Sequence, residues 1–357
     1  MDNVEIGLIT CDPHEEIYSL YGHTALRYHD LKRNIDAVYN WGVFDYAKPN
    51  FALRFVFGLT DYELGVAPIL PFCEYYQHWG SGVTEHVLNL TNKEKQNIKN
   101  ALIENCKPEN RVYRYNFFYD NCSTRPRDII ERNVCGKIIY QPRENYEPTY
   151  REMLHNHNDH HPWTAFGIDL LLGVNADRKT TMREQDFLPF NLRYDFDCAY
   201  IMRDGKRVPL VLERRQLVPP GVQLREPDFP MSPDTLFAIL LFITLAITIY
   251  EKRLHKNMRW FDTLLMTMTG LPGLVLFMMI FSEHPTTSLN LQILVLNPLA
   301  LFFIWPVWKR RKTRWFKINA ACLVVFLIGG FWQDYAEGMN FLALSLLCRS
   351  IEHYNDK

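Results

Sequence analysis

The stretch TLFAILLFITLAITIY, residues 235–250, contains no charged side chain. A run of this length approaches the ~20 residues that cross the ~30 Å of hydrocarbon in a bilayer. Three comparable runs follow it, at residues 261–282, 289–308 and 318–332. We expect a fifth span at residues 336–351, because Arg349 near its end can extend toward water. The sequence therefore predicts an all-α transmembrane bundle of four or five helices, the alternative being buried helices of a large soluble core.

The loops between these runs differ in charge. The loops 283–288 and 333–338 contain no Lys or Arg, whereas the other two loops are basic, with Lys252, Arg253, Lys256 and Arg259 in one and Lys309, Arg310, Arg311, Lys312, Arg314 and Lys317 in the other. Basic loops stay in the cytoplasm, so we expect everything before residue 235 to lie outside it. Because an exported domain needs a signal peptide, we expect one to have been removed from this mature form, with Met1 as an added initiator.

Charge and composition exclude several other classes of protein. The 357 residues carry 39 Lys and Arg against 40 Asp and Glu, and 48% are apolar, which excludes a disordered tail, a collagen-like fibre and a small disulfide scaffold. Residues 235–357 hold 12 basic and 7 acidic residues (net +5), which leaves 27 and 33 (net −6) for residues 1–234. Since the basic clusters lie only between apolar runs, we expect no nucleic-acid partner.

The outer part of the chain mixes strand and helix patterns. We predict strands at residues 5–10, 24–29 and 35–41, and helices at residues 92–104 and 123–133. Asp204 and Gly205 predict a hairpin between residues 199–202 and 207–211. The sequence therefore predicts an α+β extracytoplasmic domain over residues 1–218, a Pro-rich linker over 219–234 and a transmembrane helical domain over 235–357.

Cys122 stands out among the eight cysteines by its context. It lies in YNFFYDNCSTR, residues 115–125, where a loop enters a predicted helix. The helix dipole and nearby Arg125 and Arg127 lower the pKa of a thiol at such a place and favour the thiolate. Cys122 is therefore a candidate nucleophile. The alternative is a buried thiol or half of a disulfide, since five other cysteines share its oxidising compartment, namely Cys11, Cys73, Cys106, Cys135 and Cys198.

A nucleophilic cysteine needs a base, and His23 is the best placed of the 12 histidines. It follows Gly22 at the start of a predicted strand, so the sheet would hold its imidazole; the alternative is an ordinary surface histidine. Asn40 lies across the predicted hairpin, and Asp45 follows a few residues later. Either side chain is expected to accept the imidazole N–H as the third member of a Cys-His-polar triad.

Other polar clusters give weaker predictions. His155, His157, His160 and His161 with Asp159 have the residue types of transition-metal ligands, but so dense a run is more typical of a hydrated loop, and we expect no metal site. Residues 163–173 predict an apolar helix or wall. His284 and Asn290 are candidates to face lipid, the alternative being hydrogen bonds between helices.

The order of these motifs resembles a known family. The segment GHTALR (residues 22–27), about a hundred residues before Asn121 and Cys122, is similar to circularly permuted papain-like domains such as that of lecithin:retinol acyltransferase. With YNWGVFDY (39–46), the stretch 115–125, residues 167–173 and the membrane bundle, nearly the whole chain resembles the Lnb family of bacterial lipoprotein N-acyltransferases. This resemblance implies a permuted papain-like fold, with Cys122 as nucleophile and His23 as base.

The resemblance also implies a function. A multi-pass protein of the bacterial inner membrane, with a periplasmic thiol domain and no cofactor, would move an acyl chain from a phospholipid, through a Cys122 thioester, to the α-amine of a diacylated lipoprotein. Backbone N–H groups at the helix start would bind the oxyanion, and substrate would be positioned by Tyr21, Asn121, Ser123 and Arg125. Two alternatives stay open: a papain-like cell-wall peptidase or amidase, and a non-enzymatic envelope assembly protein.

Overall fold

The computed structural model describes residues 1–45, 47, 49–158, 160–223 and 229–354. The chain forms two compact units: unit 1 is Met1–Pro148 with Thr180–Glu226, and unit 2 is Thr149–Lys179 with Pro227–Lys357. These units differ from the predicted domains, because residues 149–179 pack with the C-terminal helices rather than within the domain 1–218. The predicted linker 219–234 lies partly outside the described residues, at 224–228.

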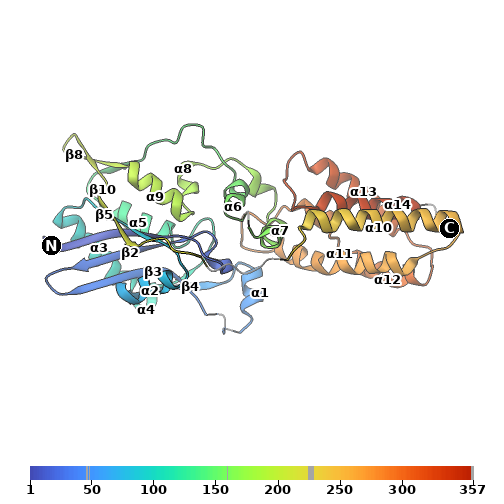
Figure 1. The fold of residues 1–357 in the computed structure, drawn as a ribbon, viewed down its shortest axis with the longest axis horizontal. Coiled ribbons are helices and arrows are strands. Elements are labelled where there is room, and N and C mark those ends of the chain that lie inside the picture. Colours follow the sequence, from blue (N-terminus) through green and yellow to red (C-terminus); the bar gives the residue numbers. More distant parts are fainter. Residues whose placement is uncertain (46, 48, 159, 224–228, 355–357) are drawn as a thin grey trace. The chain divides into compact units, whose positions relative to one another are not determined.

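Unit 1 is built on an antiparallel sheet that has seven strands in the part of the chain described (Figure 1). The strands β1, β2 and β3 confirm the three predicted near the N-terminus. Residues 31–34 connect β2 to β3, and Leu26 lies opposite Tyr39. The end of β3 therefore returns beside the start of β2. The sheet order is β10 (Val211–Val218), β5 (Val83–Leu88), β1 (Val4–Cys11), β2 (His23–Asp30), β3 (Ile35–Val43), β4 (Asp61–Pro68) and β6 (Val112–Arg114).

The helices of unit 1 include both predicted ones. The helix α3 (Asn92–Asn105) begins with a capping box, in which Thr91 and Glu94 satisfy each other's backbone N–H groups. The second is α5 (Thr124–Asn133), and the predicted hairpin forms from β8 (Tyr200–Arg203) and β9 (Lys206–Pro209), which pair beside β7 (Lys137–Ile139). The others are η1 (Ile17–Ser19), α1 (Phe51–Val56), α2 (Ile69–His78), α4 (Pro108–Arg111), α8 (Met182–Gln185) and α9 (Pro189–Cys198).

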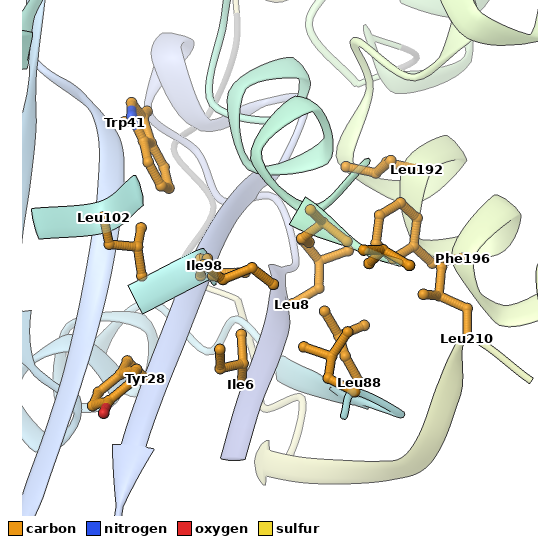
Figure 2. Close-up of a cluster of buried hydrophobic side chains, with 14 of the residues drawn as sticks. Ile6, Leu8, Tyr28, Trp41, Leu88, Ile98, Leu102, Leu192, Phe196 and Leu210 are labelled. Carbon is orange, nitrogen blue, oxygen red and sulfur yellow. The ribbon is translucent and has the colours of Figure 1, made fainter. Parts of the chain in front are cut away.

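The sheet of unit 1 is buried on both faces, because successive side chains of a strand point to opposite sides. On one face, Ile6 and Leu8 of β1 pack with α3 and α9, as Figure 2 shows for Ile98, Leu102 and Phe196. On the other face, alternate residues pack against α2, through Ile9, Cys11, Ala25, Val38, Phe72 and Tyr76. Burial of both faces makes the sheet a rigid support for residues at its strand ends.

Unit 2 is helical, and its long helices lie side by side (Figure 1). Four predicted spans coincide with helices: α10 (Pro233–Leu254), α11 (Arg259–Met279), α13 (Trp315–Gly329) and α14 (Met339–Glu352). By length and composition, α10 and α11 are the two helices within the described residues that are long and apolar enough to cross a bilayer. The number of spans therefore stays a prediction.

The predicted third span, residues 289–308, is wrong as a single helix. It forms η3 (Leu291–Leu294), a turn, and α12 (Ala300–Trp308). Pro298 has no N–H to continue a helix. The side chains of Asn290 and Asn297 accept hydrogen bonds from the backbone N–H groups of Gln292 and Leu299. Such local bonds compete with helical ones, which explains the interruption.

A buried polar network joins residues 149–179 to the rest of unit 2. These residues form α6 (Tyr150–Asn158), the predicted apolar helix α7 (Pro162–Leu171) and η2 (Val174–Asp177). Arg151 is 1% exposed and pairs with Asp169 at 2.8 Å and with Asp177 at 2.6 Å. The side chains of Gln292 and Gln333 donate to the carbonyls of Asp169 and Leu172.

A second buried ionic cluster ties α10, α11 and α14 together. Arg349 of α14 pairs with Asp262 of α11 at 2.7 Å and with Glu251 of α10. His353 lies 3.1 Å from Asp262, and Thr248 accepts a further hydrogen bond from Arg349. Because a lone buried charge is costly, this cluster fixes which faces of the three helices meet.

Candidate active site

His23 is the first residue of β2, opposite Cys11 of β1. The preceding Gly22 has φ +74°, and a Cβ there would lie 2.7 Å from the Cys11 carbonyl oxygen. Only glycine adopts this positive φ without strain and has no Cβ to collide with the carbonyl oxygen. The chain can therefore turn sharply into β2 and hold His23 at the sheet's end, as the sequence predicted.

Cys122 lies two residues before the first residue of α5, and the side chain of Asn121 builds that helix start. Its Oδ1 accepts from the N–H groups of Ser123 (2.9 Å) and Thr124 (3.0 Å). Its Nδ2 donates to the carbonyls of Phe117 and Phe187, both at 2.8 Å. Asn121 is thus a buried cap that positions Cys122.

The fold brings Cys122, His23 and Asn40 together, although they come from three elements. The His23 Nε2 donates to the Asn40 Oδ1 at 2.7 Å, which leaves Nδ1 for its hydrogen bond with Cys122. Asp45, the other predicted third member, is exposed, and its carboxylate accepts from the Ala47 N–H. Asn40 is therefore the partner of the imidazole in this structure.

The electrostatics of the pair favour a thiolate and an imidazolium. Burial raises the pKa of the Cys122 thiol, but the charge of His23 and hydrogen bonds from His23, the Thr24 backbone N–H and Ser123 together lower it below 9.0. Burial lowers the pKa of His23, but the Cys122 charge and hydrogen bonds with Cys122 and Asn40 raise it above 6.5. Each group therefore stabilises the charged form of the other.

Two residues of this site were missed by the sequence reasoning. Gly42 has φ +140° and occupies a β-bulge between Trp41 and Val43; a Cβ there would lie 3.4 Å from His23 Cε1 and 4.0 Å from Cys122 Cβ. Thr24 donates its N–H to Cys122, and its hydroxyl bonds that of Ser123 at 2.9 Å. The sequence could have indicated both residues, because Gly42 lies two positions after Asn40 and Thr24 directly follows His23. A bulge that re-aims a side chain is frequent beside active sites.

The predicted positioning residues have mainly structural contacts here. Tyr21 is buried, with its ring 5.2 Å from that of Phe117. Ser123 is fully buried, and its N–H is taken by Asn121. Arg125 makes a double hydrogen bond to Asp120, at 2.6 and 2.7 Å, and its guanidinium stacks on Tyr113. Asp120 therefore neutralises the positive charge expected beside Cys122.

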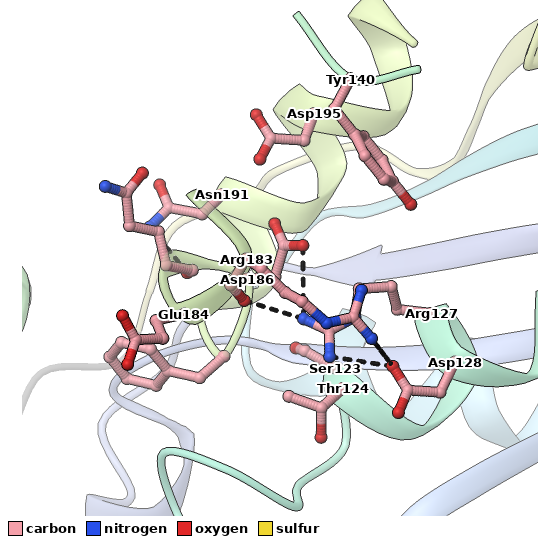
Figure 3. Close-up of polar contacts among 12 residues, drawn as sticks. Ser123, Thr124, Arg127, Asp128, Tyr140, Arg183, Glu184, Asp186, Asn191 and Asp195 are labelled. Carbon is pink, nitrogen blue, oxygen red and sulfur yellow. Dashed lines mark hydrogen bonds and ion pairs between the residues drawn. The ribbon is translucent and has the colours of Figure 1, made fainter. Parts of the chain in front are cut away.

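The far side of α5 is held by a second group of charges. Figure 3 shows Arg127 between Asp128 and Asp186, with Arg183 also reaching Asp128. Arg127 is buried, and it donates to the Arg183 carbonyl at 2.9 Å. These bonds fix α5 to α8. They also mean that Arg127, like Arg125, is paired with carboxylates. The lowered pKa of Cys122 therefore comes first from His23, and then from the hydrogen bonds of Thr24 and Ser123.

The remaining predicted residues lie apart from this site. His155 pairs with Asp169 at 2.7 Å, and Asp159 falls outside the described residues. Asn290 is buried and bonds the Leu170 carbonyl and Gln333, so the prediction that it faces lipid is wrong. His284 is partly exposed, and its lipid contact stays a prediction. All eight cysteines, each within the described residues, are free thiols, so Cys122 is not half of a disulfide.

Comparison with known proteins identifies both parts of the chain. The family model of the Lnb N-terminal periplasmic domain matches residues 1–156, and that of the Lnb transmembrane domain matches residues 225–357. Comparisons with curated proteins and with solved structures gave no match. The two matched domains make this a membrane protein with a periplasmic N-terminal domain. Since both domains occur in one chain, in the order expected from the motifs, the chain belongs to the Lnb family.

Proposed function

We propose that this protein is a lipoprotein N-acyltransferase of the bacterial inner membrane with a cysteine nucleophile. The observation that carries the proposal is the contact of Cys122 with His23, which Asn40 orients through a 2.7 Å hydrogen bond. Membership of the Lnb family supports a role in lipoprotein acylation. The order of His23 on a strand and Cys122 before a helix supports a permuted papain-like fold.

The first half-reaction takes the acyl chain from a phospholipid. The Cys122 thiolate attacks an ester carbonyl, its carbon–oxygen bond breaks, and the proton held by His23 passes to the leaving alkoxide of the lysophospholipid. The Thr24 N–H bonds the sulfur before attack. Among the hydrogen bonds of the described residues none uses the Cys122 N–H, so it remains available to the oxyanion.

The second half-reaction passes the chain to an amine. His23 takes a proton from the α-amine of the lipid-modified N-terminal Cys of a lipoprotein, the amine attacks the thioester carbonyl, and Cys122 leaves as a thiolate. A thioester suits this step better than an ester, because amines attack thioesters readily. The half-buried position of Cys122 limits the access of competing water.

Two other functions predict different results. A cell-wall peptidase with the same thiol and imidazole would cleave peptides and have no need of a membrane bundle. A non-enzymatic assembly protein would have a Cys122 that resists alkylation. The lowered pKa of Cys122 argues against the second of these, because a purely structural buried thiol has a raised pKa.

The test uses the full chain in detergent with a phospholipid and a diacylated lipopeptide. We expect intact-mass analysis to find one acyl adduct, on Cys122, and the lipopeptide to remove it as an amide. Cys122→Ala, Cys122→Ser and His23→Ala should each lower transfer by several orders of magnitude. The matched control Cys135→Ala changes an exposed thiol and should keep normal transfer. Near-normal transfer by Cys122→Ala would reject the covalent mechanism.

A further inference from the structure

We infer that an apolar hollow beside α1 binds the acyl chain that Cys122 receives from the phospholipid. The inference rests on the proposed function and adds to it the place where the chain of the thioester lies. The hollow has a volume of about 550 Å³ and is lined by Pro49, Asn50, Leu53, Arg54, Phe57 and Leu59. This volume lies within the ~300–1,000 Å³ of small-molecule sites.

The described lining of the hollow has no unpaired charge that would suit a polar ligand. Among these described residues Arg54 is the one with a charge, and its guanidinium donates to the carboxylate of Asp61 and to the Leu59 carbonyl, both at 2.8 Å. The apolar lining is open to solvent, with Leu53 49% exposed. Apolar surface around a hollow indicates an apolar ligand, because such surface is costly in free energy when it stays exposed to water.

A row of aromatic rings connects this hollow to the catalytic residues. Tyr115 stacks on Tyr62 with centroids 4.0 Å apart, and Tyr62 stacks on Phe44 at 4.7 Å. Phe44 in turn lies 6.0 Å from Phe51, the first residue of α1. All neighbouring rings in the row are tilted by 26° or less, so they form one continuous stack of apolar rings.

Two members of the row have neighbours described above. Phe44, inside the row, follows the Gly42 bulge, where a Cβ would lie 3.4 Å from His23 Cε1 and 4.0 Å from Cys122 Cβ. At the far end, Phe51 begins the helix that supplies Leu53 and Arg54 to the hollow. An acyl chain attached to the Cys122 sulfur can therefore run along the edges of these rings toward α1 and the hollow.

The test measures acylation of Cys122 by esters that differ only in chain length. The full chain is mixed with p-nitrophenyl butyrate or p-nitrophenyl palmitate in the same detergent micelles, and the p-nitrophenolate burst reports thioester formation. Each buried methylene contributes about fourfold to binding. Leu53→Ser should lower the burst rate with palmitate about tenfold and with butyrate less than twofold. The control Leu212→Ser, at a 67% exposed position on β10, should change neither.

A second variant fills the hollow rather than making it polar. Leu53→Trp should shift the preferred ester from a long chain to a shorter one, measured with a series from butyrate to palmitate. A chain preference unchanged in both variants would overturn the inference. The inference would also be overturned if the Leu53 variants lost only the later transfer of the acyl chain to a diacylated lipopeptide. The hollow would then hold the chains of the acceptor.

The two proposals fail in different ways in this experiment. A burst with butyrate that needs Cys122, but no effect of Leu53 on chain length, rejects the acyl-binding hollow and leaves the acyltransferase intact. If the unaltered protein gives no burst with either ester, the proposed function is rejected and this inference falls with it.

Discussion

At the scale of single residues, the candidate site depends on the contact between Cys122 and His23. This contact reverses the usual effect of burial on the pKa values of a thiol and an imidazole. A buried thiol and a buried imidazole each prefer to be neutral. Cys122 and His23 lie in contact, so each raises the stability of the other's charged form. Asn40 adds a hydrogen bond that orients the ring. The contact thus favours the thiolate over the neutral thiol.

The first prediction concerns the pH dependence of Cys122. Because the pKa of Cys122 is lowered and that of His23 is raised, the thiolate should persist to lower pH, and the imidazolium to higher pH, than in the isolated side chains. Alkylation by iodoacetamide, followed by mass analysis of the Cys122 peptide, should therefore have its midpoint below pH 9.0. In His23→Ala only burial and two weaker hydrogen bonds remain, so the midpoint should move upward. Equal midpoints in both proteins would contradict this account.

The second prediction concerns Gly42. An Ala at φ +140° costs about 1–3 kcal/mol of strain. Relief of that strain would displace Asn40 and His23, so we expect Gly42→Ala to lower transfer at least about tenfold. Gly205→Ala is the matched control, since Gly205 also has positive φ (+75°) but has no atom within 4 Å of its Cβ position. If both variants lose activity equally, Gly42 has no special role at the site.

At the scale of elements, α6 and α7 show how charges hold an apolar helix in place. Asp169 is the only buried residue of α7 in the structure described, while its apolar residues are partly exposed. The Asp169 carboxylate pairs with Arg151 and His155, and its carbonyl accepts from Gln292. The position of α7 in unit 2 therefore depends on polar bonds as much as on apolar packing.

The third prediction follows from that network. Arg151→Ala leaves Asp169 and Asp177 buried without their cation, which typically costs about 3–5 kcal/mol. Thermal unfolding of the full chain in detergent should show a clearly lower midpoint. Arg132→Ala is the control, because Arg132 is 78% exposed and its pair with Asp128 contributes about 0.5 kcal/mol at most. An unchanged midpoint for Arg151→Ala would show that the network is dispensable.

At the scale of the whole molecule, unit 2 is built from two separate segments of the chain. It enters at residues 149–179, returns to unit 1 for residues 180–226, and ends in the helices of unit 2. A cut before residue 235 would thus separate α6 and α7 from Asn290, Gln292 and Gln333. The outer domain and the membrane helices are not independent modules, and experiments on either should use the full chain.

The fourth prediction tests the expected topology. If the basic loops are cytoplasmic, a cysteine at Lys312→Cys should not react with a membrane-impermeant maleimide applied to intact spheroplasts. A cysteine at Ser288→Cys, in a loop without Lys or Arg, should react. Site-resolved mass analysis distinguishes both from the native thiols. Labelling at 312 and not at 288 would reverse the orientation and exclude the proposed function.

Local patterns in the sequence were sufficient to predict many elements and to name two candidate site residues. The strands β1 to β3, the helices α3 and α5 and the hairpin at Asp204 follow from periodicity and turn residues, which act over a few neighbours. Cys122 and His23 could be named because a helix start and a strand start are local features. The Lnb resemblance rested on the same short motifs.

Only the tertiary structure decided which distant residues meet. Asn40 and Asp45 were both candidates until the pairing of β2 with β3, and the bulge at Gly42 in the pairing of β3 with β4, placed Asn40 against His23. The assignment of α6 and α7 to unit 2 and the burial of Asn290 depend on bonds across more than a hundred residues. The sequence by itself determined elements and charge pattern, because these depend on neighbours along the chain. Partners of buried polar groups could not be predicted, because burial is a property of the folded chain as a whole.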